Sequence, residues 1–195
     1  KYDTFSECKS LSSITLGENV AEIGNYAFYK CSSLKNLDSI IQYSVKTIED
    51  SAFAYCDSIE SASLSDNVTQ YGNNVFSNCK GLKSVSISTK SIGTGIFNGC
   101  TALEEIQLKL EEGGKIPENA FYNCENLKVF RISTDNLTVG KNAFSNCANL
   151  NDQEIFYHIS DVEDYAFSNT GFDVIPIYSD IECIGVHAFS DCSKL

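Results

Sequence analysis

The sequence predicts an α/β repeat solenoid of about 23 residues per coil, with one parallel β-sheet face and short helical or 3₁₀ turns on the opposite face. Three observations carry this prediction: a short aromatic word that recurs nine times, a nearly constant spacing between its copies, and apolar positions that keep the same phase in most copies. A unit of this length is well below the ~40 residues that usually fold alone. We therefore expect each unit to bury its apolar side chains against the next one.

The recurrent word is Ala-Phe-x-x-Cys in its full form. Its successive phenylalanines are 23, 25, 23, 21, 24, 23, 23 and 22 residues apart. They are Phe5, Phe28, Phe53, Phe76, Phe97, Phe121, Phe144, Phe167 and Phe189. A capping residue often stands three positions earlier, as Asn25 and Asp50 do. Because the word is short and follows such a residue, we expect it to form one helical or 3₁₀ turn.

A second segment of the repeat has the pattern L-x-x-I-x-L, as at Leu103, Ile106 and Leu108. Its last two apolar residues are two apart, which is typical of a strand with alternate side chains inward. Stacked units would place these strands in parallel, ~4.8 Å apart. In the seventh unit Gln153 takes one of the normally apolar places, so the pattern is weakest there.

These phased words resemble the BspA-like, or Treponema pallidum type, leucine-rich repeats. The family signature runs L-x-x-I-x-L and then I-G-x-x-A-F-x-x-C, and residues 11–16 and 23–31 match it closely. The resemblance covers essentially the whole chain. It implies an arc of parallel strands with short helical turns outside. It also implies an extracellular or cell-surface protein of gut or oral bacteria or of anaerobic protists, with a role in adhesion and no shared catalytic residue.

Length and charge exclude several classes of protein. Residues 1–195 are expected to form a single solenoid of about eight to nine repeats, with both ends inside a repeat and a longer parent chain. A net charge of −12 argues against nucleic acid, whose phosphates attract clusters of lysine and arginine. No stretch approaches the ~20 apolar residues that span a bilayer, so no membrane insertion is expected in this segment.

The nine cysteines fall into two groups. Eight close a copy of the recurrent word, and we expect them to be small buried thiols that pack between coils. Zinc sites usually take C-x₂₋₄-C pairs, which are missing here, so we expect no metal and no cofactor. Cys183 lies outside the word, between two inward apolar residues, and is expected to be an exposed thiol that could cross-link chains or be oxidised.

Catalytic signals are weak. The two histidines, His158 and His187, stand at a strand end and in a surface position of the turn, and no Gly-rich phosphate loop is present. We therefore expect a non-enzyme.

Asn67 and Asn136 begin triplets that fit the glycosylation pattern, which matters only in a secreted eukaryotic protein.

The outward strand positions are the best candidates for function. The early coils expose small residues there, whereas the late ones expose larger residues of the types that anchor interfaces. The predicted partner-binding strand face consists of Glu105, Gln107, Lys109, Arg131, Phe156 and Tyr178. The favoured function is non-catalytic protein binding or adhesion, with a host or cell-surface protein as partner. The alternative is a structural repeat that assembles with copies of itself, end to end or laterally.

Overall fold

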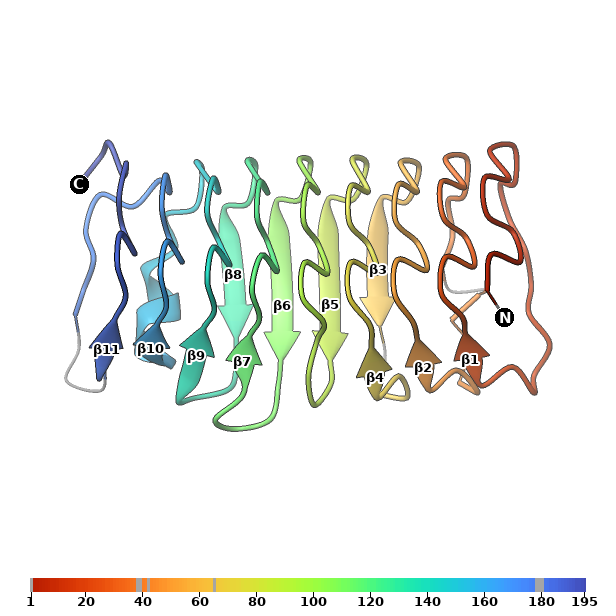
Figure 1. The fold of residues 1–195 in the computed structure, drawn as a ribbon, viewed down its shortest axis with the longest axis horizontal. Coiled ribbons are helices and arrows are strands. Elements are labelled where there is room, and N and C mark those ends of the chain that lie inside the picture. The colour runs from red at the N-terminus through yellow and green to blue at the C-terminus, as the bar shows by residue number, and fades with distance from the viewer. Residues whose placement is uncertain (1, 38–39, 42, 65, 178–180) are drawn as a thin grey trace.

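The computed structural model describes residues 2–37, 40–41, 43–64, 66–177 and 181–195. The coils stack along one axis, and in the view of Figure 1 the stack runs nearly straight, without a marked arc. Within the described residues, no helix is long and apolar enough to cross a membrane. In the central coils the chain passes down a long strand, bends, returns on the opposite side and closes with a run of turns, and most coils form a short strand on the return (Figure 1).

Four of the L-x-x-I-x-L segments form the expected parallel sheet, whereas the segment at residues 11–16 forms no strand. The sheet contains β3 (Ser61–Leu64), β5 (Ser84–Ser88), β6 (Glu105–Lys109) and β8 (Val129–Ile132), which pair in that order. The register aligns equivalent repeat positions, so that Ile87 stands opposite Leu108. Exposed and buried residues alternate along β5 and β6, because successive side chains of a strand point to opposite faces.

A second wall of strands lies across the coil from the long sheet, so the expectation of a single sheet face was incomplete (Figure 1). Here β1 (Glu22–Ile23), β2 (Thr47–Ile48) and β4 (Gln70–Tyr71) form one sheet. A second sheet contains β7 (Lys115–Ile116), β9 (Leu137–Val139), β10 (Ile159–Val162) and β11 (Cys183–Ile184). Each of these strands contains the apolar residue that precedes the phenylalanine of its own coil by five positions. Between the two sheets, the described coil at Ser91–Gly93 has no strand.

The expected helical face is wrong: the Ala-Phe-x-x-Cys word forms consecutive turns. In every copy the residues two before and two after the phenylalanine have positive φ, for example 56° at Asn74 and 57° at Asn78. A right-handed helix requires negative φ throughout, so these two residues prevent it. The turns are tied to the next coil instead, since Phe76 N donates to Ile96 O at 2.9 Å.

The centre of the molecule is a column of stacked phenylalanine rings. The nine phenylalanines of the recurrent word stack in sequence with centroids 5.1–5.7 Å apart and interplanar angles of 3–14°. The six from Phe53 to Phe167 are completely buried. Phe130 of β8 packs edge-on against two of them, Phe121 and Phe144. The column therefore joins the turn wall to the long sheet.

The long sheet ends where the sequence pattern is weakest. In place of a fifth strand, the chain forms a 3₁₀ helix, η1 (Gln153–Tyr157), whose N-cap Asp152 accepts a hydrogen bond from Glu154 N. The second Asp152 oxygen accepts from Phe130 N of β8 at 3.2 Å, which satisfies an edge amide of the sheet. Gln153 would have to bury its amide as a strand residue, which is costly without a partner.

Phe156 therefore does not face solvent, contrary to the prediction from the strand pattern. In a helix with three residues per turn, Ile155 and Phe156 both point inward, and Phe156 is 1% exposed. Its ring contacts Phe167, Phe172 and Phe189 at centroid distances of 5.5, 5.0 and 6.1 Å. Its role is to fill the core where the strand is missing.

Phe156→Ala should lower the free energy of unfolding by about 3–5 kcal/mol, because it removes a fully buried ring and leaves a cavity. The matched control is Tyr157→Ala, since Tyr157 is the next residue of η1 and is 61% exposed. The control should change stability by less than about 1 kcal/mol. Urea unfolding of both variants measures the difference, and equal stabilities would contradict the inward position of Phe156.

Candidate binding face

The outer face of the long sheet changes character along the solenoid. β3 and β5 expose only serines, at positions 61, 63, 84, 86 and 88. β6 exposes Glu105, Gln107 and Lys109, and β8 exposes Arg131. Gln107 stands directly opposite Arg131 in the register, and the Arg131 Nε atom lies 3.4 Å from Glu105 Oε1. The alternation of the strands thus brings these four predicted residues together on one face.

The ion pair on this face leaves its groups open to a partner. Arg131 and Glu105 have side chains that are 64% and 49% exposed, so the pair is solvated and contributes little to stability. Similar bridges join successive coils at Lys83–Glu60 and Lys128–Glu104. The hydrogen bond from Lys83 holds the pKa of Glu60 below its usual value. Long polar side chains on a flat sheet can recognise a protein through adaptable hydrogen bonds.

The other two predicted residues do not extend this face. Phe156 is buried, as described above, and Tyr178 lies outside the described residues. Tyr157 was not among the predicted residues, although its side chain is exposed at the end of η1. Gln153 was the sequence signal that Tyr157, and not Phe156, is exposed. A polar residue in a normally inward position indicates that the alternation of the strand has been lost. Glu105, Gln107, Lys109 and Arg131 make up the strand face.

Seven of the eight cysteines that close the word are buried, as the packing interpretation expected, whereas Cys8 in the first coil is exposed. The buried thiols of this cysteine column also form hydrogen bonds. From Cys31 to Cys147 each Sγ donates to the phenylalanine carbonyl of the preceding coil, with Sγ···O distances of 3.0–3.2 Å. Burial raises the pKa of these thiols. A neutral thiol is a poor nucleophile and a poor metal ligand, so the column is unsuited to either chemistry.

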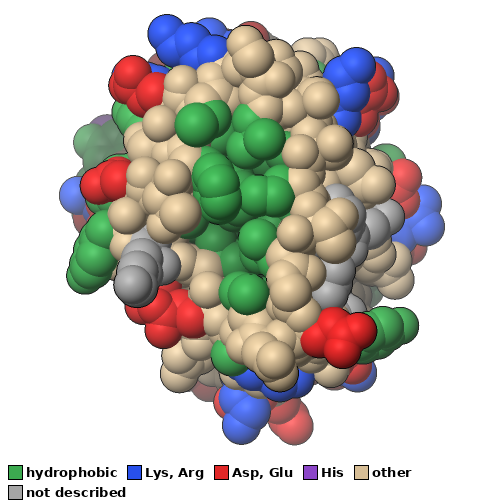
Figure 2. All heavy atoms as spheres, turned by 90° about the vertical axis from the view of Figure 1, so that its right-hand side faces the viewer, with side chains coloured by type: hydrophobic (Ala, Val, Ile, Leu, Met, Phe, Trp, Pro, Cys, Tyr) green, Lys and Arg blue, Asp and Glu red, His purple; other side chains and the backbone are tan. Residues whose placement is uncertain are grey.

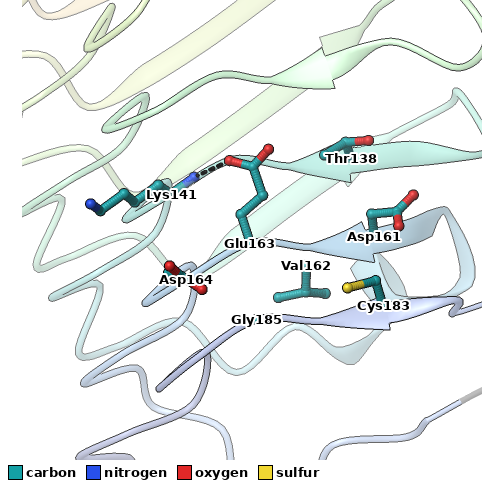
Figure 3. A pocket seen from close by; sticks show the side chains of 8 residues that line it. All are labelled: Thr138, Lys141, Asp161, Val162, Glu163, Asp164, Cys183 and Gly185. Carbon is teal, nitrogen blue, oxygen red and sulfur yellow. Dashed lines mark hydrogen bonds between the residues drawn. The ribbon is translucent and has the colours of Figure 1, made fainter.

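Figure 3 shows a shallow hollow of about 400 Å³ beside β10 and β11. It is lined by Thr138, Lys141, Asp161, Val162, Glu163, Asp164, Cys183 and Gly185. Its carboxylates already serve the fold: Glu163 accepts from Lys141 N at 3.0 Å, and Asp164 accepts from Val186 N at 2.7 Å. In the described part of the chain, no group of three or more His, Cys, Asp or Glu residues is placed to hold a metal ion.

Cys183 is exposed on β11, where its register partner is Asp161, and its neighbour Ile184 is exposed as well. The histidines have structural contacts. His158 Nδ1 lies 2.7 Å from Asp135 Oδ1, and the ring of His187 stacks on Tyr165 at 5.1 Å. Among the described residues, neither histidine is hydrogen-bonded to a cysteine or a serine.

Comparison with solved structures places the chain among bacterial leucine-rich-repeat proteins. It is similar to a leucine-rich-repeat protein from Bacteroides ovatus, with 25% identity and a TM-score of 0.78 over 97% of the chain. It is also similar to the leucine-rich-repeat protein of T. pallidum, with 27% identity and a TM-score of 0.71 over 77% of the chain. The chain spans 49% of the Bacteroides protein and 70% of the Treponema protein. No curated protein matches the chain.

A family model for the BspA-type leucine-rich-repeat region, in six copies, matches residues 1–90 and 82–195. The two matched segments together span the chain, and the coil that they describe is the one built above. Repeats of this kind commonly mediate protein interactions and are typically non-catalytic. The chain belongs to the BspA-type leucine-rich-repeat family.

Proposed function

We propose that the chain is a non-catalytic protein-binding domain of a surface or secreted protein, and that it recognises its partner through the strand face. The observation that carries this proposal is the concentration of long polar side chains on β6 and β8, beside a serine-covered β3 and β5. BspA-type proteins are typically found at the surface of bacteria or secreted by them. The partner is a host or cell-surface protein, and adhesion is the role of the interaction.

The physical support is that this part of the sheet is exposed and rigid. β6 is held in parallel register between β5 and β8, so the outward side chains of β6 and β8 are presented at fixed spacing. A rigid scaffold reduces the entropy lost on binding. Arginine is enriched at the centres of protein interfaces, and Arg131 lies beside both Glu105 and Gln107.

The serines of β5 supply a matched test of the strand face. Ser84, Ser86 and Ser88 stand opposite Glu105, Gln107 and Lys109 in the register. The variant Glu105→Ser, Gln107→Ser, Lys109→Ser, Arg131→Ser therefore copies an outer surface that this fold already accepts. We expect its binding to intact mammalian epithelial cells, measured by flow cytometry of the labelled chain, to fall at least tenfold. Its thermal midpoint should stay within a few degrees of the parent.

The control variant replaces the same kind of positions on β5, with Ser84→Ala and Ser86→Ala, and should bind like the parent. Protease treatment of the cells should abolish binding if the partner is a protein. Undiminished binding of the fourfold variant at normal stability would reject the strand face as the site. Binding that survives protease treatment would reject a protein partner.

The alternative function is a structural repeat that assembles with copies of itself. Figure 2 shows apolar side chains gathered over the first coils, where Phe5, Leu16, Val20 and Phe28 line a hollow of about 150 Å³. A sedimentation coefficient that rises with concentration would support assembly, and a constant one would reject it.

A further inference from the structure

A cluster of exposed tyrosines lies on the turn wall, away from the strand face. Tyr29 contacts Tyr26 and Tyr55 edge-on, with both pairs of ring centroids 5.5 Å apart and interplanar angles of 85° and 81°. Tyr26 and Tyr55 are 42% and 38% exposed. We name these three residues the tyrosine cluster. Other coils in the described chain place mostly small or polar residues at the equivalent positions of this wall.

The backbone at two of these tyrosines is unfavourable for the residue type. Tyr26 and Tyr55 have φ of 56° and 62°, and they occupy the two positions that flank the central phenylalanine of their coils. Elsewhere in the chain those positions mostly hold asparagine, glycine or aspartate, as at Asn74 and Asn78. Asparagine and glycine adopt positive φ at low cost, whereas a bulky aromatic residue does so rarely. Folding alone therefore does not favour tyrosine here.

The surroundings of the tyrosine cluster favour a cationic ligand. Lys30 Nζ lies 5.0 Å from the centre of the Tyr29 ring, so one ring of the cluster already holds a cation of the chain itself. Asp3 occupies the position of Tyr26 in the preceding coil, and Glu7 occupies that of Tyr55 two coils earlier. Glu7 forms an ion pair with Lys30 at 3.4 Å, so the charges of these two residues cancel. Asp3 then gives the surface a net negative charge. The whole chain has a net charge of −12.

We infer that the tyrosine cluster is a second interaction surface of this chain, which binds an arginine-bearing, extended segment of a partner protein. A guanidinium group stacks on the face of a tyrosine ring and forms forked hydrogen bonds with a carboxylate, so one arginine can use a ring and Asp3 or Glu7 together. Tyrosine adds rigid amphipathic contact area at a low entropic cost. The surface is separate from the strand face, and neither proposal depends on the other.

The test uses a capped six-residue peptide of alternating glycine and arginine, titrated into the ¹⁵N-labelled chain at 0.15 M salt. Amide shifts should be largest around residues 26–30 and 54–56. The double variant Tyr26→Asn, Tyr55→Asn introduces the residue that the fold already uses at these positions in the coil of Asn74 and Asn78. It should bind the peptide about tenfold more weakly. The double variant Tyr26→Phe, Tyr55→Phe keeps both rings and should bind within about threefold of the parent.

Two controls separate the tyrosine cluster from general attraction to an acidic protein. Tyr165→Asn makes the same change at positive φ, 57°, outside the cluster, and should leave the affinity unchanged. A peptide with citrulline in place of arginine keeps the shape but lacks the charge, and should bind at least tenfold more weakly. Equal affinity of the Asn double variant and the parent would overturn the inference. Equal affinity for the citrulline peptide, or shifts confined to the strand face, would also overturn it.

Discussion

Raising the pH from 8 to about 10.5 under reducing conditions should unfold this protein cooperatively. The cause is the cysteine column, in which burial raises the pKa of six thiols: Cys31, Cys56, Cys79, Cys100, Cys124 and Cys147. In the unfolded chain a thiol has a pKa of about 8.5. Below that value both states hold the proton, and the stabilisation from the buried neutral thiols is fully present.

Above about pH 8.5 the unfolded chain releases protons that the folded chain retains, so stability falls as the pH rises. Each of the five thiols from Cys56 to Cys147, whose pKa is raised far, then costs about 1.4 kcal/mol per pH unit, and together they cost about 7 kcal/mol per unit. Typical domains have only about 5–15 kcal/mol of stability. Burial also raises the pKa of Tyr71, which acts in the same direction at higher pH. Circular dichroism during an alkaline titration measures the midpoint.

The matched control removes titrating groups from the middle of the column. In the variant Cys79→Ala, Cys100→Ala, Cys124→Ala, the dependence of the free energy of unfolding on pH should be about half as steep between pH 9 and 10. Absolute stability will also fall, because three side chains that pack between coils are shortened. The slope is therefore the quantity to compare. An unchanged slope would show that other groups cause the alkaline unfolding.

The repeat and its sheet were readable from the sequence because burial in a solenoid follows a fixed period. The alternation at Ile106 and Leu108 fixed which side chains of β6 point outward, and so located Glu105, Gln107 and Lys109 on the strand face. Phe156 was misplaced because one polar residue, Gln153, changes the local conformation from strand to 3₁₀ helix. This change of conformation depends on the hydrogen bond between Asp152 and Phe130 of β8. The two residues are far apart in the sequence, so a local sequence pattern does not show the contact.

The turn wall shows a different limit. Asparagine at positions such as 74 and 78, and glycine at 95 and 99, were signals for positive φ that a helix cannot accept. The shortness of the word and its capping residues favoured a helical turn, although these signals pointed to consecutive turns. The hydrogen bonds of the cysteines could not be predicted from one coil, because each joins a thiol to a carbonyl of the preceding coil. Contacts between coils emerge only once the coils are stacked.

Gly93→Ala should destabilise the protein by at least about 3 kcal/mol and lower the thermal midpoint by roughly 6–12 °C. Gly93 lies in the shortest coil, where the phenylalanines are only 21 residues apart. A Cβ atom there would stand 2.0 Å from the carbonyl oxygen of Gly72 and 2.8 Å from Asn73 N. Both are backbone atoms of the neighbouring coil, so no side chain can turn away to make room.

The comparison with Gly17→Ala separates this clash from the general effect of replacing glycine. A Cβ at Gly17 would meet no atom within 4 Å, so that variant should change stability by less than about 0.5 kcal/mol. Differential scanning calorimetry of the two variants measures both midpoints under the same conditions. If Gly93→Ala were as stable as Gly17→Ala, the two coils would have to separate by more than an ångström at no cost. Because the coil at Ser91–Gly93 has no strand pairing to hold it, such a result would identify this point as a flexible joint between the two short-strand sheets.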